Sequence, residues 1–195
     1  MRYGEIARKT AETDIALRLE LDGTGQSAVQ TGVGFLDHML TLFARHGRFD
    51  LTLSCQGDTK VDDHHTLEDV GICLGQALRQ ALGDRAGIRR AGSAYMPMDE
   101  ALAFAAIDIS GRPYLAFDAA FAAPMCGTMD TQLAEEFFRA VAVHAGLTLH
   151  LRVLAGRNDH HKMEALFKAF GLALRDAVTP DARIVGALST KGALD

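Results

Sequence analysis

Two short stretches of this 195-residue chain carry the same metal-binding residue types at the same spacing. Residues 61–70 read VDDHHTLEDV and residues 157–166 read RNDHHKMEAL, so both contain D-H-H-x-x-E. On a helix, residues three and four apart share a face, so either histidine can stand beside the glutamate. Adjacent histidines point about 100° apart and can serve two different ions. A ligand set of imidazole and carboxylate without thiolate suits Mn, Fe, Zn or Ni better than Cu(I) or a structural cysteine-zinc site.

The alternative is that these residues only begin helices. Asp63 and Asp159 stand where N-caps belong, and we expect both to cap a helix. Capping does not explain why both copies keep two histidines and a glutamate, and a further histidine, His38, lies upstream. His46 and His144 precede glycines at expected helix ends and are interpreted mainly as partners of the helix dipole. The two motifs therefore favour metal binding.

The chain is an internal duplication. An offset of 96 aligns the two motifs, an offset of 88 pairs Glu12 with Glu100, and a two-residue gap pairs His38 with Glu136. The halves are residues 1–90 and 91–180, followed by a tail at 181–195. Alternating runs predict strands, and apolar residues at helical spacing predict helices ending near Gly47 and Gly146. The predicted helices are 35–45, 65–82, 131–144 and 161–177, and the strands between them are 50–55 and 147–154. Each half is thus β-β-β-α-β-α, an α+β fold in which helices pack on sheet.

Composition excludes several classes of function. Hydrophobic residues make up 48% of the chain and charged residues 23%, as in a globular protein. The net charge of -5 predicts no nucleic-acid partner. No apolar run approaches the roughly 18 residues that span a membrane, so no membrane partner is expected. The chain has 3 cysteines and no C-x-x-C, which predicts a reducing, cytoplasmic location.

Several longer motifs resemble one enzyme family. They are GFLDHM at 34–39, DDHHT at 62–66, SGRPYL at 110–115, NDHH at 158–161 and STKG at 189–192. Collinear over nearly the whole chain, they resemble imidazoleglycerol-phosphate dehydratase. The resemblance implies a helix layer between two mixed sheets, as in domain 2 of ribosomal protein S5. It also implies a manganese-dependent hydro-lyase of histidine biosynthesis that converts imidazole glycerol phosphate to imidazole acetol phosphate. The implied assembly is a shell of 24 subunits built from trimers.

The resemblance assigns roles to matching positions. It implies metal ligands at His38, His64, His65, Glu68, His160, His161 and Glu164. It implies phosphate-binding groups at Arg90, Arg112, Lys168, Ser189 and Lys191, with Thr190 in the same terminal loop. Glu12 matches a substrate-contacting acid and is the first candidate for proton transfer, with Asp99 and Glu100 as alternatives and Glu68 and Glu164 also near the chemistry. Two positions depart from many relatives: Glu136 stands in place of histidine and Leu42 in place of glutamine. We expect Glu136 to be an eighth ligand.

The expected chemistry explains this set of groups. The proton to be removed is on carbon and is not acidic. If two Mn²⁺ ions per active site hold both ring nitrogens, the ring can become imidazolate and expel the hydroxyl. Fixed positive charge where negative charge develops is usually the largest catalytic contribution. We also expect the two HHxxE helices to point to opposite ends of one chain, so that each site is completed by a neighbouring subunit.

Two rival functions use the same ligands. A binuclear phosphoester hydrolase would use metal-bound water as its nucleophile, and phosphate release would identify it. A metal-stabilised storage shell would explain the ligands but not the Arg, Lys and Ser set. An unsaturable metal load independent of substrate would identify the shell.

Overall fold

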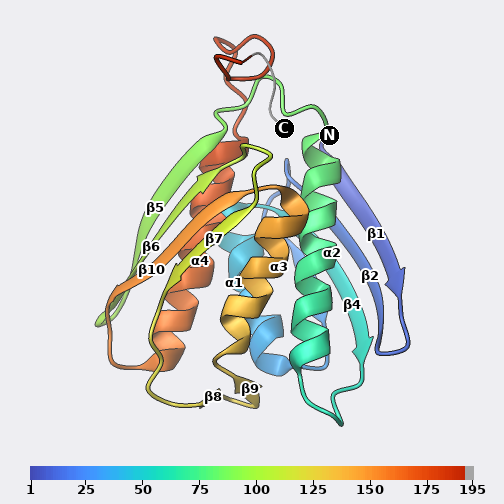
Figure 1. Ribbon diagram of the computed structural model, residues 1–195, viewed down its shortest axis with the longest axis vertical. Helices are drawn as coiled ribbons and strands as arrows, with labels where there is room; N and C mark the ends of the chain where they lie inside the picture. The colour runs from blue at the N-terminus through green and yellow to red at the C-terminus, as the bar shows by residue number, and fades with distance from the viewer. Residues whose placement is uncertain (192–195) are drawn as a thin grey trace.

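The computed structural model describes residues 1–191 and shows a layer of four helices between two four-stranded sheets (Figure 1). The first half comprises β1 (Tyr3–Lys9), β2 (Thr13–Glu20), β3 (Ser27–Gln30), α1 (Gly34–Gly47), β4 (Asp50–Gly57) and α2 (His64–Leu82). The second comprises β5 (Ala91–Met98), β6 (Ala101–Asp108), β7 (Tyr114–Asp118), β8 (Met125–Cys126), β9 (Met129–Asp130), α3 (Leu133–Ala145), β10 (Thr148–Ala155) and α4 (Asp159–Val178). The predicted α+β class and the repeated element order are confirmed. The small β8–β9 hairpin was not predicted.

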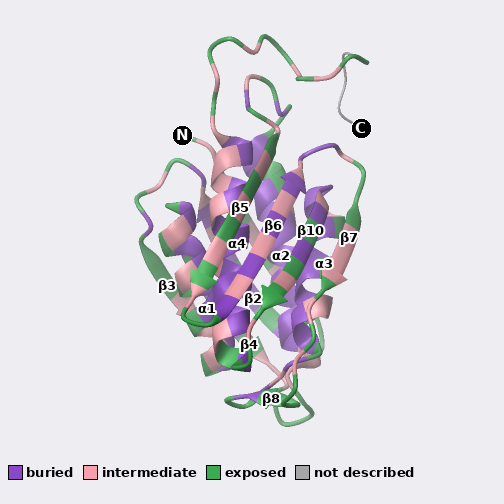
Figure 2. Ribbon diagram, turned by 90° about the vertical axis from the view of Figure 1, so that its left-hand side faces the viewer, coloured by how far each residue is buried: buried purple, intermediate pink, exposed green. Residues whose placement is uncertain are grey.

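The two sheets have the same topology. Their strand orders are β1-β2-β4-β3 and β5-β6-β10-β7. In each, the strand after the first helix pairs antiparallel with one neighbour and parallel with the other, so both sheets are mixed. Side chains alternate along a strand, and the inward set is apolar, as at Leu17, Leu53 and Leu151. Figure 2 shows the same alternation of burial along β6 and β10.

Each helix of the first half packs on a helix of the second half. Helix α1 of the first half packs on α4 of the second, and α2 packs on α3. Helix α2 also covers β1 and β2, while α4 covers β5 and β6. Fully buried rings fill the helix layer, among them Phe43, Phe138, Phe167 and Phe170. A metal ligand on one half can therefore meet ligands on the other.

Glycine allows each sheet to touch its covering helix. A Cβ on Gly4 would lie 2.1 Å from the carbonyl oxygen of Ala77 in α2. A Cβ on Gly92 would lie 2.2 Å from the carbonyl oxygen of Ala173 in α4. The same close approach thus occurs in both halves, at equivalent positions of the repeat.

The end of α1 differs from the prediction. Gly47 is the last residue of the helix, and the left-handed residue after it is Arg48, with φ 58°. The reason for glycine at 47 is space, because a Cβ there would lie 2.3 Å from the ring of Phe49. Gly146 does adopt the left-handed conformation after α3, with φ 69°, as predicted.

The starts of the two motif helices also differ from the prediction. At α4 the cap is Asn158, whose side chain accepts hydrogen bonds from the backbone N–H groups of His160 and His161. Asp159 lies inside the helix and forms a buried ion pair with Lys162 at 2.8 Å. Asp63 occupies the cap position of α2, but its side chain accepts no capping hydrogen bond. The predicted capping by both aspartates was therefore wrong.

Leu42, the other departure from many relatives, is partly buried against the apolar core. Within residues 1–191, no helix combines the length and apolar character that crossing a membrane requires. Gly192 and the rest of the expected tail to 195 lie outside the described residues.

Candidate functional site

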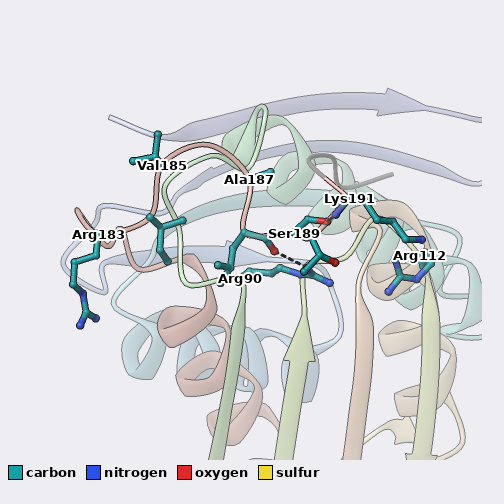
Figure 3. A pocket seen from close by; sticks show the side chains of 10 residues that line it. Arg90, Arg112, Arg183, Val185, Ala187, Ser189 and Lys191 are labelled. Atoms are coloured by element: carbon teal, nitrogen blue, oxygen red, sulfur yellow. Dashed lines mark hydrogen bonds between the residues drawn. The ribbon is translucent and has the colours of Figure 1, made fainter.

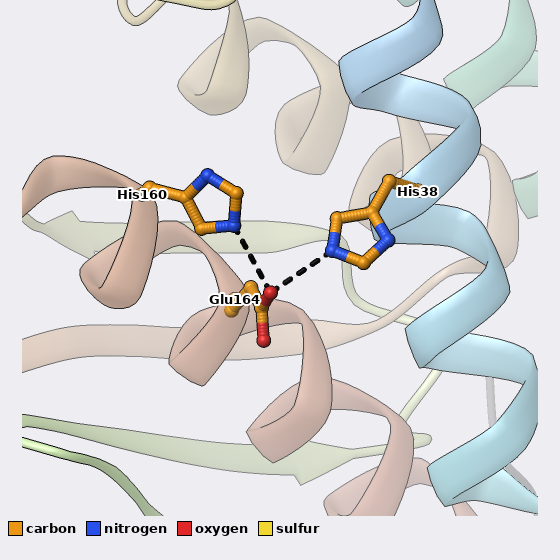
Figure 4. Close-up of side chains that lie close together, drawn as sticks. All are labelled: His38, His160 and Glu164. Carbon is orange, nitrogen blue, oxygen red and sulfur yellow. Dashed lines mark hydrogen bonds and ion pairs between the residues drawn. The ribbon is translucent and has the colours of Figure 1, made fainter.

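Three of the expected ligands converge between the halves. The Nε2 atoms of His38 on α1 and His160 on α4 lie 2.9 and 3.0 Å from the same oxygen of Glu164 (Figure 4). One ligand atom from each residue lies within 4.8 Å of the others. Both imidazoles are about half exposed, whereas Glu164 is buried, so the cluster opens to one side. Two imidazoles and one carboxylate fit a hard or borderline divalent ion such as Mn²⁺.

Glu164 is held ionised in this cluster. Burial by itself would raise its pKa, but hydrogen bonds from Lys168, His38 and His160 outweigh burial and lower the pKa to about 2. The ammonium of Lys168 lies 2.5 Å from the Glu164 oxygen that does not face the histidines. The carboxylate is therefore available as a ligand at any physiological pH.

A looser counterpart lies where α2 of the first half packs on α3 of the second. His64 Nε2 lies 3.9 Å from a carboxylate oxygen of Glu68. Glu68 and Glu136 line one small pocket together, as the packing of α2 on α3 requires. Glu136 forms an ion pair with Arg139 at 3.3 Å. Glu136 thus stands near the position expected of a ligand, and its role as an eighth ligand stays a prediction.

The second histidine of each motif lies between two carboxylates. His65 Nδ1 is 3.0 Å from Asp58, and its Nε2 is 3.6 Å from Glu12. His161 Nδ1 is 2.8 Å from Glu100, and its Nε2 is 3.8 Å from Asp99. The hydrogen bond to Asp58 raises the pKa of His65, and the hydrogen bond to Glu100 raises the pKa of His161.

Sequence reasoning did not single out Asp58. Its only signal is an acid three residues after the predicted strand 50–55 and a few residues before the first motif. Glu100 was considered for proton transfer, but its carboxylate is fully engaged. It accepts hydrogen bonds from the backbone N–H groups of Arg157 and Asn158 in addition to facing His161. Asp99, by contrast, has a side chain that is 74% exposed.

A basic pocket of about 660 Å³ lies near the C-terminus (Figure 3). Of the expected phosphate-binding groups, it is lined by Arg90, Arg112, Ser189, Thr190 and Lys191. Arg90 has a left-handed backbone with φ 68°, which is uncommon outside glycine. Asp108 accepts hydrogen bonds from its Nε and Nη2 at 2.6 and 2.9 Å, and Leu188 O accepts one from Nη1.

Lys168 does not line this pocket. Its ammonium pairs with Glu164 in the metal-type cluster instead. One expected phosphate-binding group therefore lies among the expected metal ligands.

The metal-type clusters and the basic pocket occupy opposite ends of the molecule. In Figure 1 both α2 and α4 begin at the lower end, and the segment after α4 forms the upper end. The expectation that the two motif helices point to opposite ends was therefore wrong. Strand β6 measures the separation, because Glu100 just before it meets His161 and Asp108 at its end meets Arg90. The strand itself, seven residue steps from Ala101 to Asp108 at about 3.3 Å each, spans roughly 23 Å.

Comparisons with known proteins give a consistent result. A family described as imidazoleglycerol-phosphate dehydratase matches residues 31–174. The imidazoleglycerol-phosphate dehydratase of Acetivibrio thermocellus is 60% identical over 193 residues, 99% of each chain. That of Symbiobacterium thermophilum is 62% identical over 99% of this chain and 93% of its own.

Solved structures agree with the sequence comparisons. A crystal structure of imidazoleglycerol-phosphate dehydratase from Staphylococcus aureus has a TM-score of 0.84 at 45% identity, covering 92% of this chain and 99% of that chain. The enzyme from Pyrococcus furiosus, in complex with (S)-C348, has a TM-score of 0.84 at 37% identity, covering 97% of this chain and 100% of that chain.

Proposed function

The chain belongs to the imidazoleglycerol-phosphate dehydratase family, and on that basis we propose that it removes water from imidazole glycerol phosphate to give imidazole acetol phosphate, a step of histidine biosynthesis. The observation that carries the proposal is the convergence of His38, His160 and Glu164, because it supplies the ligand set expected for this chemistry.

Two divalent ions are part of the proposal, with Mn²⁺ as the expected metal. His38, His160 and Glu164 would hold one, and His64, Glu68 and Glu136 offer donors for another, with His65 and His161 nearby. When bound, the ions supply positive charge that favours loss of a proton from the substrate's imidazole ring. The donor set fits, because every group is an imidazole or a carboxylate.

Proton transfer at carbon and at the leaving hydroxyl falls to acids beside the second histidines. Glu12 stands 3.6 Å from His65 Nε2 with a half-exposed side chain, so it can reach a bound substrate. Asp99 holds the corresponding place beside His161. One acid removes a proton from carbon while another protonates the hydroxyl. The engaged carboxylate of Glu100 makes Asp99 the better of the two alternatives to Glu12.

The phosphate of the substrate is assigned to the basic pocket. Arg112 offers a planar pair of donors and Lys191 a point charge, as phosphate recognition requires. Binding energy from this remote group can be used to orient the reacting end. The pocket and the metal-type cluster of one chain are roughly 23 Å apart along β6. The extended substrate is only about 10 Å long by its covalent bonds.

One substrate therefore cannot reach both sites of a single chain. We place the active site between subunits, with the phosphate pocket of one chain beside the metal ligands of another. Lys168 supports this arrangement, because it is a phosphate-binding candidate that already lies at the metal end. A closed homo-oligomer satisfies the requirement for every copy, and the expected assembly is 24 subunits built from trimers.

The test is metal removal followed by product analysis. Chelator-treated protein should form no ketone from imidazole glycerol phosphate, and added Mn²⁺ should restore ketone formation. His38→Ala should lose most of this activity at any Mn²⁺ concentration. His150→Ala is the matched control, because His150 is exposed on β10 away from the cluster. Full activity in rigorously metal-free protein, or phosphate release in place of ketone, would refute the proposal.

A further inference from the structure

One carboxylate lies next to Nδ1 of each second histidine, Asp58 next to His65 and Glu100 next to His161. The proposed metal ligation and proton transfer assign no role to these two carboxylates. We propose that Glu100 and Asp58 are positioning residues that keep the proton of these imidazoles on Nδ1 and leave the Nε2 lone pair, which faces Asp99 in one half and Glu12 in the other, free to bind a metal ion. The inference rests on the proposed metal-dependent function, and its test separates the two.

Glu100 is built into its place by three hydrogen bonds. Its Oε1 accepts from the backbone N–H groups of Arg157 and Asn158 at 3.0 and 2.7 Å. Its Oε2 faces His161 Nδ1 at 2.8 Å. An ionised carboxylate only accepts hydrogen bonds, so Nδ1 must be the donor. The neutral ring then carries its lone pair on Nε2, the atom that faces Asp99.

Asp58 does the same for the other half from a different element. It follows β4, and its backbone N–H donates to the carbonyl oxygen of Glu12 at 3.0 Å, which ties it to the segment before β2. Both of its carboxylate oxygens face His65 Nδ1, at 3.2 and 3.0 Å. The Nε2 of His65 therefore carries the lone pair and faces Glu12.

The two carboxylates are not equivalent in the repeat. Glu100 aligns with Glu12 at the offset of 88, yet Glu100 faces Nδ1 of its histidine and Glu12 lies off Nε2. Asp58 aligns with Leu154 at the offset of 96. A contact inherited from the ancestral half would use matching positions. The same arrangement made by unmatched residues indicates that the arrangement itself is required.

The requirement follows from how imidazole binds metals. Only the unprotonated ring nitrogen can be a ligand, and the hydrogen bond at the other nitrogen decides which one that is. Carboxylates in this position fix the ring orientation and raise ligand basicity, and their loss typically costs about 10- to 100-fold in metal affinity.

Glu100→Gln gives the sharpest test. The glutamine oxygen takes the place of Oε1, because two backbone N–H groups need an acceptor there. Its NH₂ group must then face His161 Nδ1, which can only accept from it. The proton of the ring moves to Nε2. The substitution is isosteric and keeps the backbone hydrogen bonds, so the fold is expected to persist.

The readout is the tautomer of the histidine rings, measured by magic-angle-spinning ¹⁵N NMR on metal-free, ring-labelled protein at alkaline pH. One ring should change from the Nδ1–H to the Nε2–H form in Glu100→Gln. Asp58→Asn should leave His65 unchanged, because both oxygens of Asp58 face Nδ1 and an asparagine can present its own oxygen. Asp118→Asn, at an exposed aspartate on β7, is the control.

Mn²⁺ affinity, measured by calorimetry, gives the second readout. Glu100→Gln should weaken binding about 10-fold or more, and Asp58→Asn and Asp118→Asn less than about 3-fold. An unchanged tautomer in Glu100→Gln, or an inverted tautomer with unchanged Mn²⁺ affinity, overturns the inference. The tautomer is read without metal or substrate, so it remains decisive for the positioning role even if the native protein proves inactive in dehydration.

Discussion

Mixing two inactive variants tests whether the active site lies between subunits. His160→Ala removes a ligand from the metal-type cluster, and Arg112→Ala removes a donor from the basic pocket. Each variant alone should be nearly inactive. If a substrate bridges roughly 23 Å of separation only by contacting two chains, a mixed assembly should regain activity.

The size of the recovery follows from counting. In an assembly formed from equal amounts of the two variants, half of the chains carry an intact pocket and half an intact cluster. A site that takes its pocket and its cluster from different chains is complete in about a quarter of cases. Co-expression with two affinity tags, followed by tandem purification and a ketone assay, should give roughly that fraction of native activity.

Two outcomes have clear meanings. Activity no higher than that of the separate variants would show that pocket and cluster of one chain serve the same substrate, and the distance argument would be wrong. As a control, His160→Ala is mixed with His38→Ala. Both substitutions damage the same cluster within one chain, so no mixture of these two can restore a complete site.

Three further predictions follow from other contacts. Gly92→Ala should lower the free energy of unfolding by about 1–3 kcal/mol in a denaturant titration, because its Cβ meets the α4 backbone, whereas Gly34→Ala, whose Cβ would meet no atom of residues 1–191 within 4 Å, should cost far less. Glu136→Ala should lose most of one of two bound ions per site, whereas Glu136→His should keep both; unchanged metal content in the alanine variant would exclude Glu136 as a ligand. The pKa values of His65 and His161 are raised by their carboxylate partners. In metal-free protein their ion pairs should therefore stabilise the fold below about pH 6.5, and that contribution should be lost as pH rises through the raised pKa values. Protons should compete with Mn²⁺ over the same range, so an affinity that does not fall on acidification would contradict this.

The elements of the fold could be predicted because the sequence carries its signals locally. Alternating apolar residues gave the strands, helical spacing gave the four helices of residues 1–191, and the repeated motif gave the duplication. The helix ends were less predictable. Asp159 has the residue type of an N-cap, but it lies inside the helix, where it forms an ion pair with the buried Lys162 one turn later. Gly47 has the residue type that commonly ends a helix, but glycine is needed there because the ring of Phe49 leaves no room for a Cβ.

The site could be predicted only in its parts. The HHxxE spacing predicted a histidine beside the glutamate on one helix face, and in the structure the first histidine of each motif lies there. Which upstream residue meets which motif depends on helix packing between halves, so the pairing of His38 with His160 has no local signal. The direction of the two motif helices also depends on the sheets that cover them. Asp58 could not be found because a single acid after a strand is common.

The interlocking of α1 with α4, and of α2 with α3, bears on how such a chain could arise. A separate half would carry one upstream ligand and one motif, but the helices on which both of these pack belong to the other half. Two identical halves could bring an upstream ligand and a motif together only by forming a dimer. The symmetry of that dimer would then make its two clusters identical. Fusion into one polypeptide removes that constraint. The equivalent positions of the two halves hold His38 and Glu136, and two identical copies could not have differed in this way.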